Sequence, residues 1–152
     1  MAKKKPRSDK RIVNRRARFD YELGDSLVVG LQLTGAETKA LRLGHGTLRG
    51  AYVTVKDDEL WLINAQISST RGIQIPEDTQ TRTRKLLAKR AEIDRLITSK
   101  QQGYTIVPLE LLTSGRFIKL RIAAGKGKKS FDKRETIKRR QQERDIARQT
   151  YK

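Results

Sequence analysis

The side chains in this chain that are best equipped for chemistry are cations, and they are concentrated at its two ends. Residues 126–152 contain eleven Lys or Arg against four Asp or Glu, and residues 1–18 contain nine against one. The segment between them contains fifteen against twelve, which completes the formal net charge of +18. Two cationic ends around a nearly neutral body attract a polyanion in a salt-dependent way, without a shaped pocket. The charge pattern therefore predicts a nucleic acid as the partner, with an anionic membrane surface as the weaker alternative.

Residues suited to covalent or metal chemistry are few. The chain has no cysteine and a single histidine, His45, so neither a thiolate metal site nor a histidine pair for zinc can form. The acidic run Asp57-Asp58-Glu59 has the character of a turn, and a metal-assisted nuclease would need a histidine pair or a convincing carboxylate cluster. We therefore expect no enzymatic activity, no cofactor and no metal site.

Length and composition limit the domain organisation. With 152 residues, of which 36% are hydrophobic and 34% charged, the chain fits one modest domain with polar extensions. We expect a basic N-terminal arm over residues 1–18, a folded domain over 19–125 and a basic tail over 126–152. No apolar run resembles a signal peptide or approaches the roughly 18 to 20 residues of a membrane span, which predicts a cytoplasmic protein without a membrane partner.

Short strands separated by turns are predicted for most of the folded domain. The segments that have strand character are residues 27–29, 31–33, 48–55, 60–63, 104–107 and 117–122. Gly30 separates the first two and indicates a bend, and Asp57 with Asp58 indicates the turn of a hairpin. Trp61 and Tyr52 stand at alternating strand positions and are expected in the core, although base stacking is the other role open to them.

Two helices are expected between these strands. The Thr34 hydroxyl and the Glu37 carboxylate fit a capping box, so that a helix should follow and run to about Leu43. A longer helix is predicted over 81–99, because three apolar residues recur at helical spacing; these are Leu86, Ile93 and Ile97. Five or six short strands with two helices favour a small closed barrel, and a split sheet with helices on one side is the alternative.

The tail beyond residue 125 has very few apolar side chains. Their burial cannot offset the entropy of ordering the segment, so we expect the isolated tail to be disordered. Asp132 is nevertheless followed three residues later by Glu135, and Glu135 forms a favourable i,i+4 pair with Arg139. We interpret the tail as a latent helix that forms on a polyanion.

Five motifs occur in order between about residues 12 and 140. They are NRRARFDY at 14–21, TGAETKALR at 34–42, TRTRKLL at 81–87, GYTIVPL at 103–109 and GKKSFDKRE at 127–135. Together they resemble the SmpB family, the small protein B of bacterial trans-translation, and five ordered motifs are far more specific than one. The resemblance implies a mainly β fold, an OB-fold-like small closed barrel with two or three helices and a basic C-terminal tail.

The resemblance also implies a set of partners. The barrel would bind the tRNA-like domain of transfer-messenger RNA (tmRNA), and the tail would enter the vacant mRNA channel and reach the decoding centre of a stalled ribosome. Elongation factor Tu and alanyl-tRNA synthetase would act indirectly, on the RNA, and one copy of the chain would bind each RNA. A structural ribosomal protein and a general basic RNA-binding protein are the alternatives, because basic arms are common in both classes.

Specific residues acquire roles from this resemblance. A folded RNA elbow presents unstacked bases and phosphates, so the interface needs base-edge hydrogen bonders beside cations. Asn14 and Glu37 suit base edges; for Glu37, helix capping and base contact are both open. The residues assigned to tmRNA phosphates are Arg15, Arg16, Arg18, Lys39 and Arg42, with Arg84 and Lys85 on the predicted second helix, where a solvated face is the alternative.

The tail residues assigned to the ribosome follow from the last motif. Phe131 stands where the family places an aromatic residue or histidine that stacks on a base of the decoding centre, an interaction of about 1 to 3 kcal/mol. The residues expected to contact the channel are Lys126, Gly127, Lys128, Lys129, Phe131, Asp132, Lys133 and Arg134.

Overall fold

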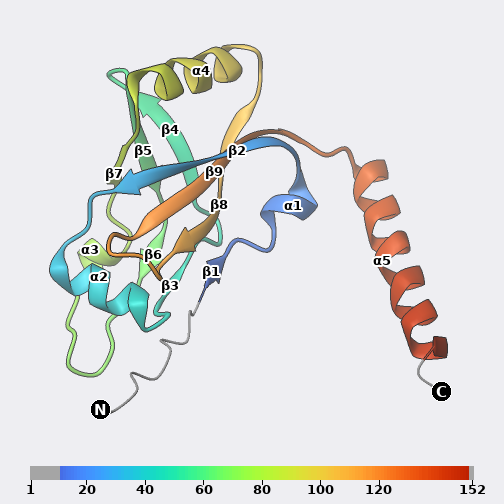
Figure 1. Ribbon diagram of the computed structural model, residues 1–152, viewed down its shortest axis with the longest axis horizontal. Coiled ribbons are helices and arrows are strands. Elements are labelled where there is room, and N and C mark those ends of the chain that lie inside the picture. Colours follow the sequence, from blue (N-terminus) through green and yellow to red (C-terminus); the bar gives the residue numbers. More distant parts are fainter. Residues whose placement is uncertain (1–10, 151–152) are drawn as a thin grey trace, which may run out of the picture.

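The computed structural model describes residues 11–150, apart from the side chains at 130–132 and 150. The strands are β1 (Ile12–Val13), β2 (Tyr21–Leu31), β3 (Gly46–Thr47), β4 (Tyr52–Lys56), β5 (Glu59–Ile63), β6 (Gln66–Ile67), β7 (Arg84–Leu87), β8 (Thr105–Leu112) and β9 (Lys119–Gly127). The helices are α1 (Ala17–Asp20), α2 (Gly35–Arg42), α3 (Glu77–Gln80), α4 (Arg90–Gln101) and α5 (Ser130–Thr150). Figure 1 shows a strand-built body from which α5 stands apart.

Seven strands form one sheet in the order β1-β8-β4-β5-β7-β2-β9, and an additional pairing of β8 with β9 brings its ends together. The β8–β9 ladder is long, from Thr105 opposite Gly125 to Leu112 opposite Lys119. Only Val53 opposite Ile106 joins β4 to β8, and β7 is joined to β2 and to β5 by two residue pairs each. The result is a partly closed barrel, which confirms the predicted mainly β architecture.

The barrel surrounds the main core, and a smaller core lies outside it. Leu60, Leu86, Leu120 and Ile122 are fully or almost fully buried in the main core, as apolar residues on alternating strand positions should be. The smaller core joins α1 to β8 and β9 and consists of Ala17, Val107, Leu109 and Ala123. Burial of Ala17 therefore fixes the cationic segment around α1 against the barrel.

Strand β2 differs from the prediction of two strands separated at Gly30. It is a single strand of eleven residues that passes through the glycine without interruption. Its first part pairs with β9, and at Gly30 and Leu31 it pairs with β7. A Cβ atom on Gly30 would lie 3.1 Å from the Leu87 Cβ, so the glycine is needed for the close approach of β7.

The predicted hairpin is confirmed. Strands β4 and β5 meet at Lys56 opposite Glu59, and the two residues between them, Asp57 and Asp58, have φ angles of 53° and 58°. Positive φ at both central residues suits the twist of a two-residue hairpin, and aspartate tolerates it better than most residues. The expectation for Tyr52 is wrong, because its side chain is 44% exposed.

The helix predicted over 81–99 is wrong in its first half. Residues 84–87 form β7, in which the buried residues Arg84 and Leu86 alternate with less buried neighbours. Helix α4 begins only at Arg90, where the Glu92 carboxylate accepts from the Lys89 N–H at 3.1 Å. The period-two pattern of a strand, not the helical spacing, decides the structure here. Figure 1 places α4 at one end of the barrel and α2 at the other.

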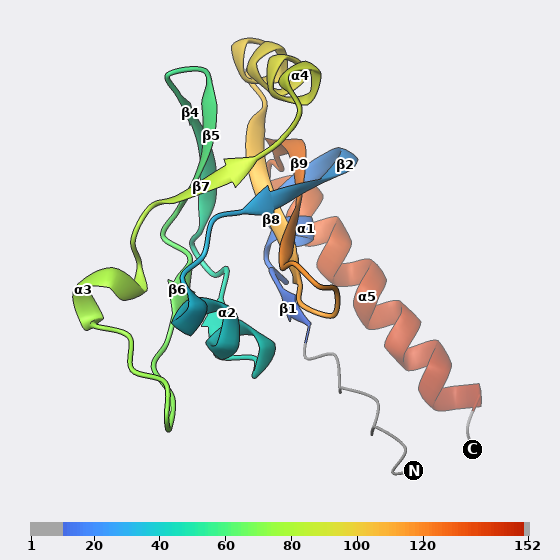
Figure 2. The same ribbon diagram turned by 60° about the vertical axis from the view of Figure 1, so that its left-hand side comes forward.

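Helix α5 leaves the barrel at the end of β9. It has 21 residues and begins at Ser130, two residues before the Asp132 of the predicted cap, and Figure 2 shows it running beside α1 and away from the barrel. Strand β9 continues two residues beyond 125, and α1 spans residues on both sides of the limit placed between 18 and 19; the division into arm, domain and tail stays a prediction. Disorder of the isolated tail stays a prediction. Most of the predicted N-terminal arm, residues 1–10, lies outside the described residues.

Candidate nucleic-acid interface

A buried carboxylate, Glu37, organises the end of the barrel that α2 covers. The Thr34 N–H donates to Oε1 of Glu37 at 3.0 Å, and the Glu37 N–H donates to the Thr34 hydroxyl at 3.2 Å, which confirms the capping box. Two guanidinium groups bind the same carboxylate: Arg82 contacts Oε1, and Nε of Arg84 donates to Oε2 at 2.6 Å. Glu37 is only 2% exposed and is therefore enclosed by these donors.

Arg84 extends this network to other segments. Its side chain is completely buried, with Nη1 donating to the Ala65 carbonyl at 2.6 Å and Nη2 to the Gln80 carbonyl at 3.0 Å. Ala65 follows β5, and Gln80 ends α3, where helix carbonyls without an intrahelical partner attract a cation. Arg84 therefore joins α2, the segment after β5, α3 and β7.

The environment keeps Glu37 ionised and unavailable to a ligand. Burial alone would raise the pKa of Glu37, but hydrogen bonds from Arg82, Thr34 and Arg84, with the charge of Arg84, hold that pKa below its ordinary value. Of the two roles left open for Glu37, the structure shows helix capping, combined with pairing to two arginines. The predicted RNA contact of Arg84 is wrong, because its side chain faces inward from a strand.

Three of the predicted phosphate-binding residues lie together on the segment before and within α1. Arg15, Arg16 and Arg18 are exposed, and Arg16 is also paired with Asp20 at 3.5 Å. Asn14 anchors this segment: its side-chain amide donates to the Pro108 carbonyl at 2.9 Å. The amide nitrogen predicted for a base edge is thus directed toward β8, and the arginines beside it keep their access to solvent.

A hollow of about 350 Å³ adjoins this segment. Four arginines line it, two from the predicted set and two that were not predicted, together with Glu110 at 3.4 Å from Arg121; the four are Arg15, Arg18, Arg121 and Arg140. Arg121 comes from β9 and Arg140 from α5, so the body and the tail helix both contribute cations. Such a group of arginines suits the oxygen atoms of a phosphate.

The other predicted phosphate-binding residues lie elsewhere. Lys39 is exposed on α2. Arg42, on the same helix, donates to the Thr113 carbonyl at 2.8 Å and to the Arg116 carbonyl at 2.9 Å, which ties α2 to the loop between β8 and β9. Lys85 is on β7 and forms an ion pair with Glu59 at 3.0 Å. The structure thus separates these cations from the group around α1.

The tail helix meets the body at Asp20. The Lys128 N–H donates to the Asp20 carbonyl at 2.8 Å, and Lys133 Nζ lies 3.3 Å from the Asp20 carboxylate. Lys128 Nζ also donates to the Thr136 hydroxyl at 3.4 Å. These contacts involve only the first turns of α5, and residues 137–149 are exposed.

The predicted tail residues therefore divide into two groups. Gly127 pairs with Tyr21 inside the β2–β9 ladder, and Lys126 lies 4.8 Å from the centre of the Tyr104 ring. With Lys128 and Lys133 engaged at the junction, the predicted tail cations on the exposed surface are Lys126, Lys129 and Arg134. The side chains of Phe131 and Asp132 lie outside the described residues.

Among the described residues 11–150, no group of three or more His, Cys, Asp or Glu is placed to hold a metal ion. In the same part of the chain, none of the helices combines the length and the apolar character that a membrane crossing requires.

The model of a protein family described as "SmpB protein" matches residues 11–152. The chain belongs to the SmpB family. An SsrA-binding protein of Trichormus variabilis is 47% identical over 137 residues, which cover 89% of this chain and 88% of the relative. An SsrA-binding protein of Synechocystis sp. is 42% identical over 97% of both chains. A chain in a solved structure described as "tmRNA-SmpB: a journey to the center of the bacterial ribosome" is 34% identical, with a TM-score of 0.65 over 80% of this chain and 86% of that chain.

Sequence reasoning missed several residues of this SmpB-family chain. Arg82 and Arg84 alternate with threonines, a period-two signal that would have placed both on one side of an extended segment. Arg121 is a cation on β9 that was not among the predicted site residues. Nothing in the spacing of Arg140 indicates that it reaches the hollow near Arg15.

Replacement of Glu37 by glutamine should destabilise the fold by about 3–5 kcal/mol at neutral pH, because it leaves the buried Arg84 without its counter-charge. The folded-state pKa of Glu37 is depressed, so this stabilisation is complete above the unfolded-state pKa of about 4.3 and disappears as pH falls through the folded-state value. Urea unfolding of wild type and Glu37→Gln at several pH values tests this. The difference should shrink with acidification.

The control for that experiment is Glu59→Gln, which breaks the ion pair with Lys85 at the surface. Exposed pairs of this kind contribute about 0–1 kcal/mol, so the control should differ little from wild type at any pH. An equally small effect of Glu37→Gln at neutral pH would contradict the role assigned to the buried network.

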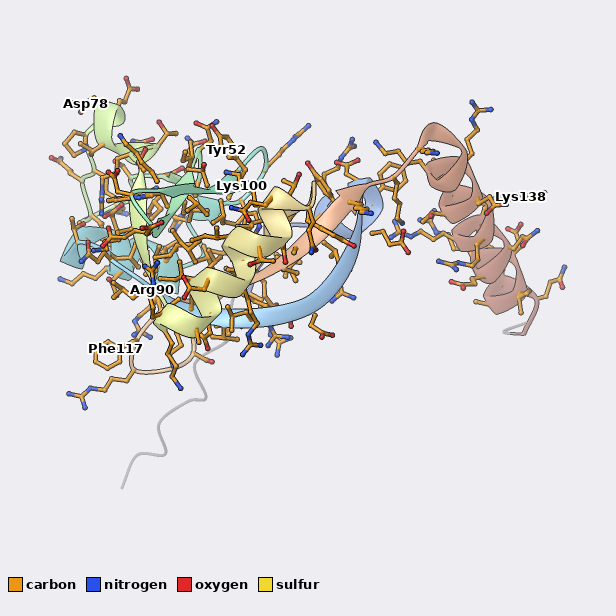
Figure 3. The ribbon with its side chains drawn as sticks, turned by 90° about the horizontal axis from the view of Figure 1, so that it is seen from above. Tyr52, Asp78, Arg90, Lys100, Phe117 and Lys138 are labelled. Carbon is orange, nitrogen blue, oxygen red and sulfur yellow. The ribbon has the colours of Figure 1, made fainter. Side chains whose placement is uncertain are left out.

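Asp20→Asn should loosen the attachment of α5, because it removes the carboxylate that pairs with Lys133 and Arg16. The chain has no cysteine, so Lys100→Cys and Lys138→Cys can carry spin labels on α4 and α5, where Figure 3 shows both side chains at the surface. Pulsed EPR should give a broader distance distribution for Asp20→Asn. The matched control is Asp25→Asn, at an exposed position of β2. Identical distributions for both variants would refute the junction.

Proposed function

We propose that this chain is an SsrA-binding protein that binds tmRNA and acts in trans-translation on the ribosome. The observation that carries the proposal is its membership of the SmpB family, with SsrA-binding proteins that are 42–48% identical over 89–97% of the chain. The net charge of +18 supports an RNA partner. A structured RNA such as tmRNA offers a dense phosphate surface, which the exposed cations of this chain complement.

We propose that the body of the protein recognises the tRNA-like domain of tmRNA. The exposed arginines around α1 are held in place by the burial of Ala17 and by the bond from Asn14 to Pro108. A cation on a fixed segment loses less entropy on binding a phosphate than one on a free arm. Exposed Lys39 on α2 supplies a further cation, apart from the group around α1, and Arg42 on the same helix holds the β8–β9 loop.

We propose that the tail enters the vacant mRNA channel and reaches the decoding centre. The ion pair and hydrogen bond of α5 at its junction with the body involve its first turns, and residues 137–149 are exposed, so this part of the helix offers its cations to a channel lined with RNA. Between residues 126 and 152 the tail contains eleven cations and four acids, a balance that suits phosphate surroundings. The stacking role of Phe131 stays a prediction.

The remaining parts of the proposal follow from the partner. An RNA-bound factor of this kind works in the cytoplasm, where ribosomes translate, and it needs no catalytic residues because the ribosome performs the chemistry. Elongation factor Tu and alanyl-tRNA synthetase, acting on the RNA, and a single copy of the chain per RNA stay predictions of the family resemblance. A structural ribosomal protein would instead remain on ribosomal subunits washed in high salt.

The double replacement Arg15→Gln/Arg18→Gln should weaken tmRNA binding and flatten its salt dependence. Each lost phosphate contact reduces the magnitude of the negative slope of log K against log[salt] by about one. The slope of the double variant should therefore be shallower than that of wild type by about two. Filter binding or fluorescence anisotropy with labelled tmRNA at several salt concentrations measures this slope.

The matched control is Arg90→Gln/Arg95→Gln, which removes the same charge from exposed positions of α4. Its slope should equal that of wild type, because α4 lies apart from α1, at another end of the barrel (Figure 1), and charges beyond a Debye length of about 8 Å are largely screened. Equal slopes for both double variants would contradict the interface around α1.

Removal of residues 130–152 should separate the two functions. This cut keeps β9 and Lys128, which belong to the folded body, so the affinity for tmRNA should stay within several-fold of wild type. Tagging of peptides on stalled ribosomes should be lost in a reconstituted translation assay. Normal tagging by the truncated chain would contradict the role of the tail, and loss of tmRNA affinity would contradict the division of roles.

A further inference from the structure

Phe117 is the most exposed of the large apolar side chains in the described part of the chain, with 70% of its surface accessible. It lies in the loop between β8 and β9, and Figure 3 shows its ring at the outer edge of the body. A single exposed apolar residue is ordinary on a protein surface. Two further observations distinguish this one: the loop is held rigidly, and its surroundings are cationic.

The loop is anchored on both sides of its tip. Arg42 donates from α2 to the carbonyls of Thr113 and Arg116, at 2.8 and 2.9 Å, and so closes the loop from outside. On the other side, Ile118 follows Phe117 directly and is buried in the main core. The aromatic ring is therefore presented at a defined position, and little conformational entropy remains to be lost when a ligand covers it.

The charged residues close to Phe117 along the chain are all cations. The guanidinium carbon of Arg116 lies 5.5 Å from the centre of the Phe117 ring. Lys119 follows two residues later and is exposed, and Lys39 is exposed on α2, one turn before Arg42. Residues 111–119 contain no Asp or Glu, and the acid of α2, Glu37, is buried. An acidic protein surface would pair with these cations but would not need the aromatic ring. RNA would contact both, with its phosphates on the cations and a base on the ring.

We propose that Phe117 is a stacking platform for an unpaired RNA base, with Arg116 beside the ring and the exposed Lys39 and Lys119 available to the flanking phosphates. Aromatic side chains between cations bind single-stranded nucleotides in this way, because every base has a π-face and every linkage carries a charge. The site is separate from the arginines around α1. The inference rests on the proposed function, since it takes from it that the partner is RNA.

The test compares Phe117→Leu with Phe117→Trp in the full-length chain. Leucine keeps an apolar side chain but cannot stack, whereas tryptophan stacks at least as well as phenylalanine. Phe117→Leu should weaken RNA binding about 5- to 150-fold, the range that corresponds to the loss of one stacked base, and Phe117→Trp should bind like wild type. Purified tmRNA and stalled ribosomes carrying tmRNA serve as separate probes, so that the source of the base is distinguished.

A fluorescence readout tests the contact itself. In the background Trp61→Phe, the variant Phe117→Trp has its single tryptophan at the proposed platform. Its emission should be quenched when a base stacks on it. Quenching by tmRNA alone would assign the base to tmRNA, and quenching only with stalled ribosomes would assign it to the ribosome-bound state. Unquenched emission with both probes, or a Phe117→Leu variant with wild-type affinity for both, would overturn the platform. Loss with Phe117→Ala but not with Phe117→Leu would indicate an apolar protein pocket and would also overturn it. Absence of any tmRNA binding by wild type would instead refute the proposed function.

Discussion

The ion pairs of Glu37 with Arg82 and Arg84 are the interaction on which the rest of the body depends. Burial of a carboxylate and a guanidinium group is costly unless the charges are paired and every donor finds an acceptor. Here the carboxylate accepts from Thr34, Arg82 and Arg84, and Arg84 also reaches the carbonyls of Ala65 and Gln80. A single buried cation on β7 thus holds α2, the end of α3 and the segment after β5 in one arrangement.

The cations that face solvent gain their positions from this arrangement. Helix α2, which the network holds at its first turn, carries Lys39 outward and uses Arg42 to close the β8–β9 loop. The segment around α1 is held separately, by the small core at Ala17 and by Asn14. The body therefore presents exposed cations on segments that are already ordered. The tail differs, because its bonds to the body lie at Asp20 and the side chains of residues 137–149 are exposed.

The sequence predicted the features that depend on near neighbours. The capping box at Thr34 and the turn at Asp57 and Asp58 are both local, and both are confirmed. The helix expected from residue 81 failed because a helical spacing of three apolar residues was given more weight than the strand-like alternation around Arg84. The five ordered motifs predicted the family, which the comparison with known proteins confirms.

The partners of Glu37 could not have been predicted in the same way. Arg82 is 45 residues from Glu37 along the chain, and no spacing rule connects a helix cap to a strand at that separation. An acid within a cationic motif suggested a contact with a base, whereas the fold supplies two arginines of its own. The same limit applies to Arg140, which reaches the hollow near α1 only through the placement of α5.

The buried network of Glu37, Arg82 and Arg84 should hold the body in its folded arrangement before any RNA is present. Hydrogen–deuterium exchange of the full chain, free and bound to tmRNA, tests it most directly at the amides of Thr34 and Glu37, which are bonded within the network. Both amides should exchange slowly in the free protein, and RNA should change their exchange rates little. Rapid exchange in the free protein, with strong protection only after tmRNA is added, would show that the RNA orders this region and would contradict the account.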